Sequence, residues 1–312
     1  MISLVDKPKL VVGLLAEDQE FQRMQADDAR TAAVHAGFDV QILFAENSAI
    51  LQIQQLYKAI HAPEDQRPKA IIVETVVGEG LGRVASAAAR AGVGWVLINR
   101  KVSYLEGLRR EHPGLPIAAV STDQVEVGRI QARQFQALLP SGQGLVLYVQ
   151  GPADTSAAQE RLQGVREGLA GGPIDLKILD GQWTEASGEQ AVQRWLRLKS
   201  SEELHPDVVG CQNDAMAVGV RRALEAWAAR PELARLPLTG CDGLPDGGQR
   251  LVNMGQLAAT VIAPSNTGPA VEAVARALKT RQPIPGELFL KPSSYPSEAD
   301  ILRRVTSRRA PG

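Results

Sequence analysis

GCQNDAMAVG, residues 210–219, and GCDGLPDG, residues 240–247, are the two stretches that decide the fold of this chain. In each, an apolar run stops at amide or carboxylate side chains and then opens into a helix or a turn. Such a run is typical of a buried strand in a parallel sheet. Ligands of open α/β sheets bind at the carboxyl ends of such strands, so we expect a binding site where these polar groups collect.

The rest of the chain repeats this alternation of short β-branched runs with longer stretches of helical periodicity, which predicts an α/β fold with parallel sheets. The predicted strands are Lys9–Ala16, Asp39–Ala45, Ala70–Thr75, Trp95–Asn99, Ala118–Ser121, Leu145–Gln150, Leu176–Leu179, Val208–Gln212, Leu238–Cys241 and Thr260–Ala263. The predicted helices include Gln22–His35, Val125–Leu139, Ala157–Leu169, Ala215–Ala229 and Thr267–Lys279. Right-handed crossovers would wind the strands into two successive, doubly wound lobes.

The division between the two sets of strands falls near residues 121–123. No low-complexity linker separates the sets, since LPSGQG at 139–144 is typical of a helix end followed by a turn. Two lobes without a flexible tether indicate a hinge, and a hinge indicates a cleft in which a ligand binds.

Composition limits the classes of partner. The chain has 312 residues, 44% of them apolar, with 34 basic against 35 acidic residues and a pI near 6.5. We therefore predict no nucleic-acid partner and no insertion into a membrane, and no run reaches the ~18 apolar residues of a spanning helix. Residues 1–9 lack the regions of an export signal, which predicts a cytoplasmic protein as written, or a periplasmic one if a leader was trimmed.

Cofactor and metal motifs are missing from the sequence. The histidines are scattered, and Cys211 and Cys241 have no metal-ligand or CxxC spacing, so we expect no metal and two small buried thiols. GEGLGR at 78–83 resembles a dinucleotide fingerprint, but Arg83 stands where a glycine is required, and a helix-opening turn is favoured. Because no nucleophile or phosphate-binding motif occurs either, we expect no cofactor and no enzymatic activity.

Four motifs together carry a family resemblance: TSAAQER at 155–161, QND at 212–214, DGLPDG at 242–247 and GQLAATV at 255–261. With them the chain resembles the type I periplasmic binding protein family, particularly its simple-sugar binding proteins and the sensor cores of lactose-repressor-type regulators. The resemblance covers about Lys9 to Lys291 and implies two lobes joined by a three-segment hinge. It implies a first lobe of residues 1–122 with 264–287, and a second of residues 123–263 with 288–312.

The resemblance also implies a set of ligand-binding residues at the strand ends. Phe21 would be an aromatic platform, and Asn99 with Arg100 a hydrogen-bonding pair after the fourth strand. The other lobe would contribute Arg161, Trp183, Asn213 and Asp242. In the family, these groups enclose one monosaccharide, and the loaded protein engages an ABC permease or a sensor kinase.

Three positions depart from the family pattern. Gln22 stands where a second Phe is common, Glu74 where Asn is usual, and Ala263 where a hinge Gln is expected. These departures make ribose itself doubtful. We include Glu74 among the candidate ligand-binding residues and hypothesise that its extra acceptor favours an amino-bearing ligand.

The residue types suit a sugar or polyol. Aromatic faces match the C–H patches of a sugar ring, and Asp, Asn and Arg match its rim of hydroxyl groups. Two arginines, Arg100 and Arg161, would face two carboxylates, Glu74 and Asp242. Because the formal charges cancel, a neutral polyol is favoured over a phosphate or a dicarboxylate.

Each candidate also has a purely structural interpretation. Asn213 and Asp214 could both serve a helix N-terminus, although we favour Asn213 as the ligand contact and Asp214 as the cap. Asp242 could belong to a local turn, and Arg161 could pair with an acidic neighbour, Glu160 or Glu167, on an exposed helix face. Two other functions remain open: a detached cytoplasmic sugar sensor, and a sugar-modifying enzyme that uses Glu74 and Asp242 as its carboxylates.

Overall fold

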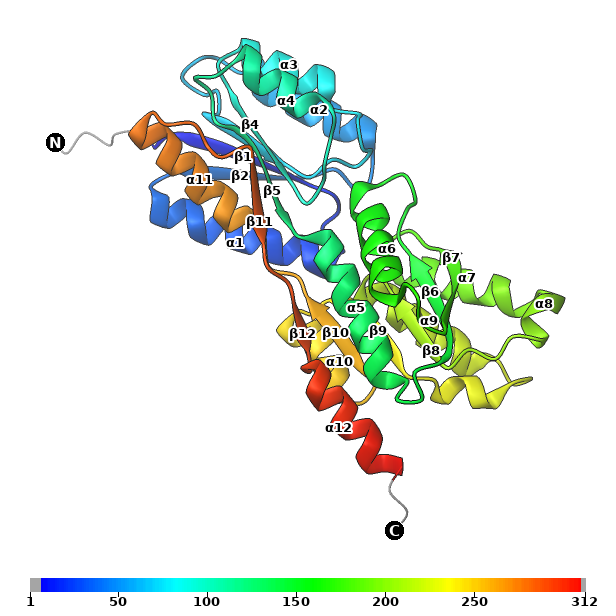
Figure 1. Ribbon diagram of the computed structural model, residues 1–312. Helices are drawn as coiled ribbons and strands as arrows, with labels where there is room; N and C mark the ends of the chain where they lie inside the picture. Colours follow the sequence, from blue (N-terminus) through cyan, green and yellow to red (C-terminus); the bar gives the residue numbers. More distant parts are fainter. Residues whose placement is uncertain (1–6, 310–312) are drawn as a thin grey trace. The chain divides into compact units, whose positions relative to one another are not determined.

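The protein, seen in a computed structural model that describes residues 7–309, consists of two α/β units (Figure 1). The first unit runs to Thr122 and takes in Ser265–Leu290, whereas the second comprises Asp123–Pro264 and resumes at Lys291. The chain therefore passes between the units three times. Pro264 lies in the second unit rather than the first, and residues 288–290 lie in the first rather than the second, because they pair with a strand there.

The sheet of the first unit is entirely parallel, in the order β11-β5-β4-β3-β1-β2. Its strands are β1 (Lys9–Leu14), β2 (Asp39–Phe44), β3 (Ala70–Val73), β4 (Gly94–Ile98), β5 (Ile117–Thr122) and β11 (Glu287–Leu290). Every residue of β3, β4 and β5 is buried, as expected for strands covered on both faces, whereas the edge strand β2 alternates between exposed and partly buried residues.

Helices cover both faces of this sheet, as Figure 1 shows. They are α1 (Glu20–Ala36), α2 (Ala49–Ile60), α3 (Gly82–Arg90), α4 (Tyr104–Glu111) and α11 (Thr267–Thr280). Helices α1 and α11 bury alanine- and valine-rich faces in one core with β1, β3, β4 and β5, whereas α2, α3 and α4 pack on the opposite face. Apolar residues at helical spacing on α1 and α11 thus close one side of the unit.

The second unit has a sheet in the order β12-β10-β9-β8-β6-β7, in which only β12 is antiparallel to its neighbour among the described strands. Its strands are β6 (Gly144–Gln150), β7 (Ile174–Asp180), β8 (Val208–Cys211), β9 (Leu238–Asp242), β10 (Ala259–Ile262) and β12 (Ser293–Tyr295). Its helices are α5 (Gln124–Leu138), α6 (Ser156–Leu169), α7 (Glu185–Leu196), α8 (Lys199–Glu202), α9 (Asp214–Ala226), α10 (Arg250–Asn253) and α12 (Glu298–Arg309), with a 3₁₀ helix at Pro231–Arg235 and a π-helical turn at Pro245–Gln249.

Close helix packing in the second unit depends on glycine. A Cβ on Gly128 of α5 would lie 2.0 Å from the carbonyl oxygen of Arg161 on α6, and one on Gly164 would lie 2.0 Å from that of Val125. These glycines let the backbones of α5 and α6 touch, because no side chain separates them. Arg161 is therefore one of the residues at which the backbones of the two helices meet.

The predicted fold class and all of the predicted strands are confirmed, with β11 and β12 as additional short strands. In the first sheet the strand order reverses between β1 and β3, and in the second between β6 and β8. These are the topological switch points at which open α/β sheets bind ligands, beyond the carboxyl ends of the strands. The sequence motifs singled out above lie at those ends.

Candidate functional site

A buried polar cluster follows β3 and β4 in the first unit. Glu74, Asn99 and Arg100 are 1%, 7% and 5% exposed. The Glu74 Oε1 atom accepts a hydrogen bond from Asn99 Nδ2 at 3.0 Å and lies 3.3 Å from Arg100 Nη2. Its Oε2 atom accepts from Gln22 Nε2 at 3.0 Å, so both carboxylate oxygens are engaged within the unit. The carboxylate therefore binds three neighbouring side chains, an arrangement that the sequence did not reveal.

Two glutamines of α1 hold the strand ends of the first unit in place. Gln22 accepts from the backbone N–H of Leu15 at 3.0 Å through the amide oxygen, which leaves its Nε2 to donate to Glu74. Gln25 is fully buried, and its Oε1 accepts from Ser265 Oγ and from the backbone N–H groups of Asn266 and Thr267 at 2.8–3.1 Å. Because α11 has no side-chain cap of its own, Gln25 serves as its cap from another helix.

Phe21 occupies the first turn of α1, next to Gln22. It is partly exposed and belongs to neither apolar core described for this unit. Its position after β1 agrees with the expected location of an aromatic platform, whereas its role as a ligand contact remains a prediction.

In the second unit, Arg161 is buried rather than exposed. It is 4% exposed, and its Nε donates to Gln124 Oε1 at 2.7 Å while its Nη1 donates to the carbonyl oxygen of Gln212. The guanidinium lies 5.5 Å from the centre of the Trp183 ring, within cation–π range. The alternative in which Arg161 pairs with Glu167 on an exposed face is wrong, because Glu167 pairs instead with Arg129 at 2.7 Å.

The expectation that Asp214 caps α9 is also wrong, whereas the ligand contact of Asn213 stays a prediction. Asn213 is the N-cap of α9, since its Oδ1 accepts from Met216 N at 2.9 Å. Asp214 does not cap the helix in this way. Its buried carboxylate accepts from the backbone N–H of Gly243 and from Thr260 Oγ1, each at 2.8 Å. Asp214 thereby fixes the turn that carries Asp242.

Three of the proposed ligand-binding residues have strained backbones. Asn99, Trp183 and Asp242 have φ angles of 56°, 64° and 107°, in the left-handed region that non-glycine residues rarely adopt. Each lies at or after the carboxyl end of a strand or just before a helix N-terminus. Such strain persists only where the surroundings impose it, and it clusters at functional sites. The same conformation also occurs at Glu46, Asn47 and Arg281, so a left-handed backbone alone does not identify the ligand contacts.

The two cysteines are small buried thiols, as expected. Burial raises the pKa of Cys241 to about 12 and also raises that of Cys211, because the charged thiolate would lose its hydration. Within residues 7–309, no group of three or more His, Cys, Asp or Glu side chains is arranged to hold a metal ion. None of the described helices is both long enough and apolar enough to span a bilayer.

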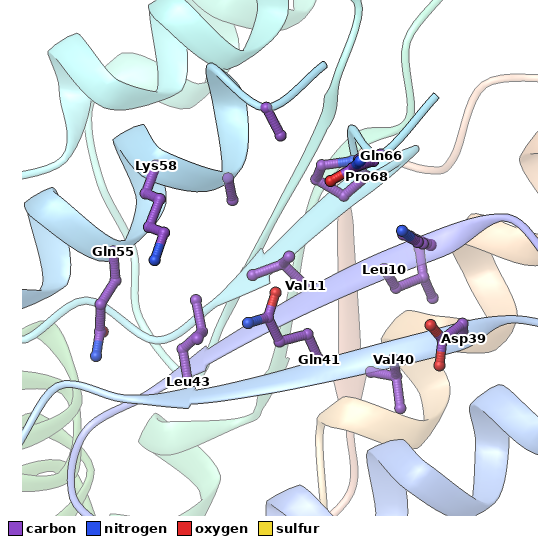
Figure 2. Close-up of a pocket in the computed structure, with 13 residues that line it drawn as sticks. Leu10, Val11, Asp39, Val40, Gln41, Leu43, Gln55, Lys58, Gln66 and Pro68 are labelled. Carbon is purple, nitrogen blue, oxygen red and sulfur yellow. The ribbon is translucent and has the colours of Figure 1, made fainter. Parts of the chain in front are cut away.

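A cavity of about 570 Å³ in the first unit lies apart from these residues, toward the amino ends of β1 and β2 (Figure 2). Lys58 and Gln55 project from α2 over β2, from which Gln41 and Leu43 extend into the same space. None of the proposed ligand-binding residues lines this cavity. It is therefore a separate feature at the uncovered edge of the sheet.

Comparison with known proteins decides the family. A model of the periplasmic binding protein domain matches residues 11–282, which is most of the chain. The chain belongs to this family. The ribose import binding protein of Escherichia coli K12 is 26% identical over 75% of this chain and 72% of its own length. A xylitol-binding protein of Mycolicibacterium smegmatis is 30% identical over 65% of this chain and 53% of its own length.

Solved structures of the periplasmic binding protein family confirm the fold. The arabinose-binding component of an ABC transporter from Shewanella sp. ANA-3 superposes with a TM-score of 0.79 at 21% identity, covering 97% of both chains. A Caulobacter myo-inositol binding protein gives 0.77 at 24% identity over 96% of this chain and 97% of its own. The motif resemblance to type I binding proteins of the simple-sugar class is thus confirmed. This is a family of binding and transport proteins rather than of enzymes.

Proposed function

We propose that the protein is a solute-binding protein that closes on one uncharged monosaccharide-like or polyol molecule. The main observation behind this proposal is that binding-type side chains gather at the carboxyl ends of the strands in both units. They are Glu74, Asn99 and Arg100 in the first unit, and Arg161 with Trp183 in the second. Charged and amide groups bind hydroxyls strongly where water is excluded, and the indole face suits sugar C–H groups. The named ligands of its relatives, ribose, xylitol and myo-inositol, are uncharged polyhydroxylated molecules.

The proposed contacts are Phe21, Asn99, Arg100, Arg161, Trp183, Asn213 and Asp242. Glu74, which the sequence also placed among the ligand contacts, engages Gln22, Asn99 and Arg100 with its two oxygens, and this supports a positioning role for it. The hypothesis of an amino-bearing ligand stays a prediction; because the Glu74 carboxylate is paired with Arg100, we expect an ammonium group to gain little at this position. Asn213 caps α9 with its amide oxygen and donates one amide hydrogen to the carbonyl oxygen of Trp183. Its second amide hydrogen is therefore the group that would reach a ligand.

A thermal-shift panel tests this function. The probes are D-ribose, D-allose, L-arabinose, xylitol, myo-inositol and, as the amino-bearing control, D-glucosamine. A ligand present at about 100 times its dissociation constant adds about 2.7 kcal/mol to the free energy of unfolding. We expect at least one neutral probe to stabilise the protein and D-glucosamine to be no better than the neutral probes. No stabilisation by any neutral sugar or polyol would reject the proposal.

Truncation variants locate the contacts. Arg161→Ala and Asp242→Ala should each weaken binding of the stabilising probe by roughly 2–5 kcal/mol, because they leave an opposing polar group unsatisfied in a dry site. Glu160→Ala, on the neighbouring position of the same helix, serves as the control and should leave affinity unchanged. Incubating the bound sugar with the protein and analysing it for products separates this function from the enzyme alternative.

The partner we propose is an ABC permease that accepts the ligand-bound form, with a sensor kinase as the second candidate. The names of several relatives, which include import and ABC transporter components, support the first. Such a role implies a periplasmic location. Transport of the bound probe in a reconstituted permease assay would support import, whereas ligand-dependent autophosphorylation of a kinase would support signalling.

A further inference from the structure

The Glu74 carboxylate is the most enclosed charge in the first unit's polar cluster. It is 1% exposed, and each of its contacts is with another side chain of the same cluster. An ionised carboxylate only accepts hydrogen bonds, so the groups that face it must be donors. This requirement fixes the orientation of both amides, Gln22 and Asn99, whose nitrogens point toward Glu74.

The orientation of Gln22 is determined twice. Its oxygen accepts from Leu15 N at 3.0 Å and its nitrogen donates to Glu74 at 3.0 Å, so a flipped amide would lose both bonds. For Asn99, the bond from Nδ2 to Glu74 turns the amide oxygen to the other side of the side chain. Because Asn99 has a left-handed backbone, its side chain has few other positions in which to satisfy this bond.

Glu74 also compensates the charge of Arg100. The two side chains are 1% and 5% exposed and lie 3.3 Å apart. An arginine that is paired with a protein carboxylate is poorly available for the bidentate grip on a ligand carboxylate that guanidinium groups otherwise favour. A ligand carboxylate brought to this cluster would in addition meet the negative charge of Glu74. The cluster thus accepts hydroxyl groups and disfavours acids.

We propose that Glu74 is a positioning and specificity-determining residue, which selects neutral polyols against the corresponding sugar acids by fixing the Asn99 amide and neutralising Arg100. This inference rests on the proposed function, in that it assumes that Asn99 and Arg100 contact the ligand. It assigns Glu74 no ligand contact of its own.

Calorimetric titration with matched pairs of probes tests the inference. Each pair consists of a neutral molecule and its acid: xylitol with D-xylonate, D-ribose with D-ribonate, and D-allose with D-allonate. The wild-type protein should prefer the neutral member. In Glu74→Gln, which keeps the shape but removes the charge, the affinity ratio should shift toward the acid by about tenfold or more. An unchanged ratio overturns the inference.

A control and a rescue separate positioning from general charge effects. Glu79→Gln removes an exposed carboxylate from the same unit, one that accepts from Ser103 N and Oγ, and should leave the ratio unchanged. The rescue is the conservative variant Glu74→Asp, which keeps a carboxylate at this position and should retain a preference for the neutral probe that Glu74→Gln loses. A purely structural role for Glu74 predicts that the two variants change the ratio alike.

The remaining outcomes are also decisive. If Glu74→Gln does not fold, the ratio is measured in Glu74→Asn, which also removes the charge and supplies the amide that is usual in the family at this position. The ratio should again shift toward the acid, and an unchanged ratio overturns the inference. If the wild-type protein binds no neutral probe, the proposed function fails and the specificity inference falls with it. If it binds the neutral probes and Glu74→Gln leaves the ratio unchanged, the inference alone fails, so the two failures are distinguishable.

Discussion

Asn213 donates a hydrogen bond from Nδ2 to the carbonyl oxygen of Trp183 at 2.9 Å, and this bond joins the start of α9 to the strained loop before α7. The oxygen of the same amide caps α9 through Met216 N. One side chain therefore joins the start of the helix to the backbone of Trp183. The relationship explains how a non-glycine residue such as Trp183 is held at a φ of 64°.

Replacing Asn213 should destabilise the protein, whereas replacing another buried asparagine, Asn266, should have little effect. Asn213→Ala loses a cap and a buried hydrogen bond, and we expect the free energy of unfolding to fall by about 1–3 kcal/mol. Asn266, also fully enclosed, has no hydrogen-bond partner for either side-chain polar atom within the described part of the chain. Asn266→Ala should therefore change stability by less than about 1 kcal/mol in urea unfolding. Equal losses in the two variants would contradict this explanation.

Gly151 sets the position of the Trp183 ring. A Cβ at Gly151 would lie 2.2–2.4 Å from the indole atoms Cζ2, Cη2 and Cε2, so Gly151→Ala must displace the ring. We expect a shifted tryptophan fluorescence maximum and at least about tenfold weaker sugar binding, with cooperative unfolding retained. Gly107→Ala on α4, where a Cβ meets no atom within 4 Å among the described residues, is the control and should change neither signal. Wild-type fluorescence and affinity in Gly151→Ala would show that the ring is placed by something else.

Asp214 stabilises the turn that contains Asp242 through hydrogen bonds to its carboxylate. Asp214→Ala removes two hydrogen bonds to a buried carboxylate, those from Gly243 N and Thr260 Oγ1, and should reduce the free energy of unfolding by about 3 kcal/mol or more. Asp246→Ala, at an exposed position of the same segment, should cost less than about 0.5 kcal/mol. Chemical denaturation measures both variants. A small effect of Asp214→Ala would mean that the turn is stable without its carboxylate.

The two buried thiols predict a loss of stability at alkaline pH. Unfolded cysteines release their protons near pH 8.5, whereas burial raises the pKa of Cys241 to about 12 and that of Cys211 likewise. Above about pH 8.5 the unfolded state therefore binds fewer protons than the folded state, and stability falls by about 1.4 kcal/mol per pH unit for each thiol. For Cys241, the stability that comes from burying the protonated thiol is fully present below pH 8.5 and is lost as the pH rises toward 12.

Urea unfolding between pH 8 and pH 10 measures this slope. The double variant Cys211→Ala with Cys241→Ala should show a flatter pH dependence than the wild-type protein, because it lacks both titrating groups. Native protein should also react slowly with a thiol reagent, since neither cysteine is exposed. Identical slopes in the two proteins would place the alkaline sensitivity elsewhere.

Local patterns were sufficient to predict the main elements of the fold. Runs such as AIIV in β3 and GWVLI in β4 are apolar throughout because both faces are covered, and α5 and α6 have the helical spacing of apolar residues. The short strands β11 and β12 were not predicted because neither is a buried apolar run; their residues are exposed or only partly buried, unlike those of the equally short β3. Their placement follows from pairing with β5 and β10, strands distant in the chain.

The roles of individual polar residues depended on partners far away in sequence. Gln22 and Glu74 are 52 positions apart, and Gln25 caps a helix whose first residue, Thr267, follows 242 positions later. No window of local sequence contains such pairs, which is why the partners of Gln22, Gln25 and Gln124 could not be predicted, although Gln22 stood out as a departure from the family pattern. The only local signal was the presence of amides at buried helix positions.

The sequence by itself determined that this chain forms two α/β lobes and that polar residues gather at the carboxyl ends of their strands, because apolar runs and the residues that end them act over a few neighbours. Only the tertiary structure decided what each polar side chain does. It assigned Asn213 to a cap, Asp214 to a turn and Glu74 to its own unit's amides and arginine, because a buried hydrogen bond forms only where the folded chain brings donor and acceptor within about 3 Å.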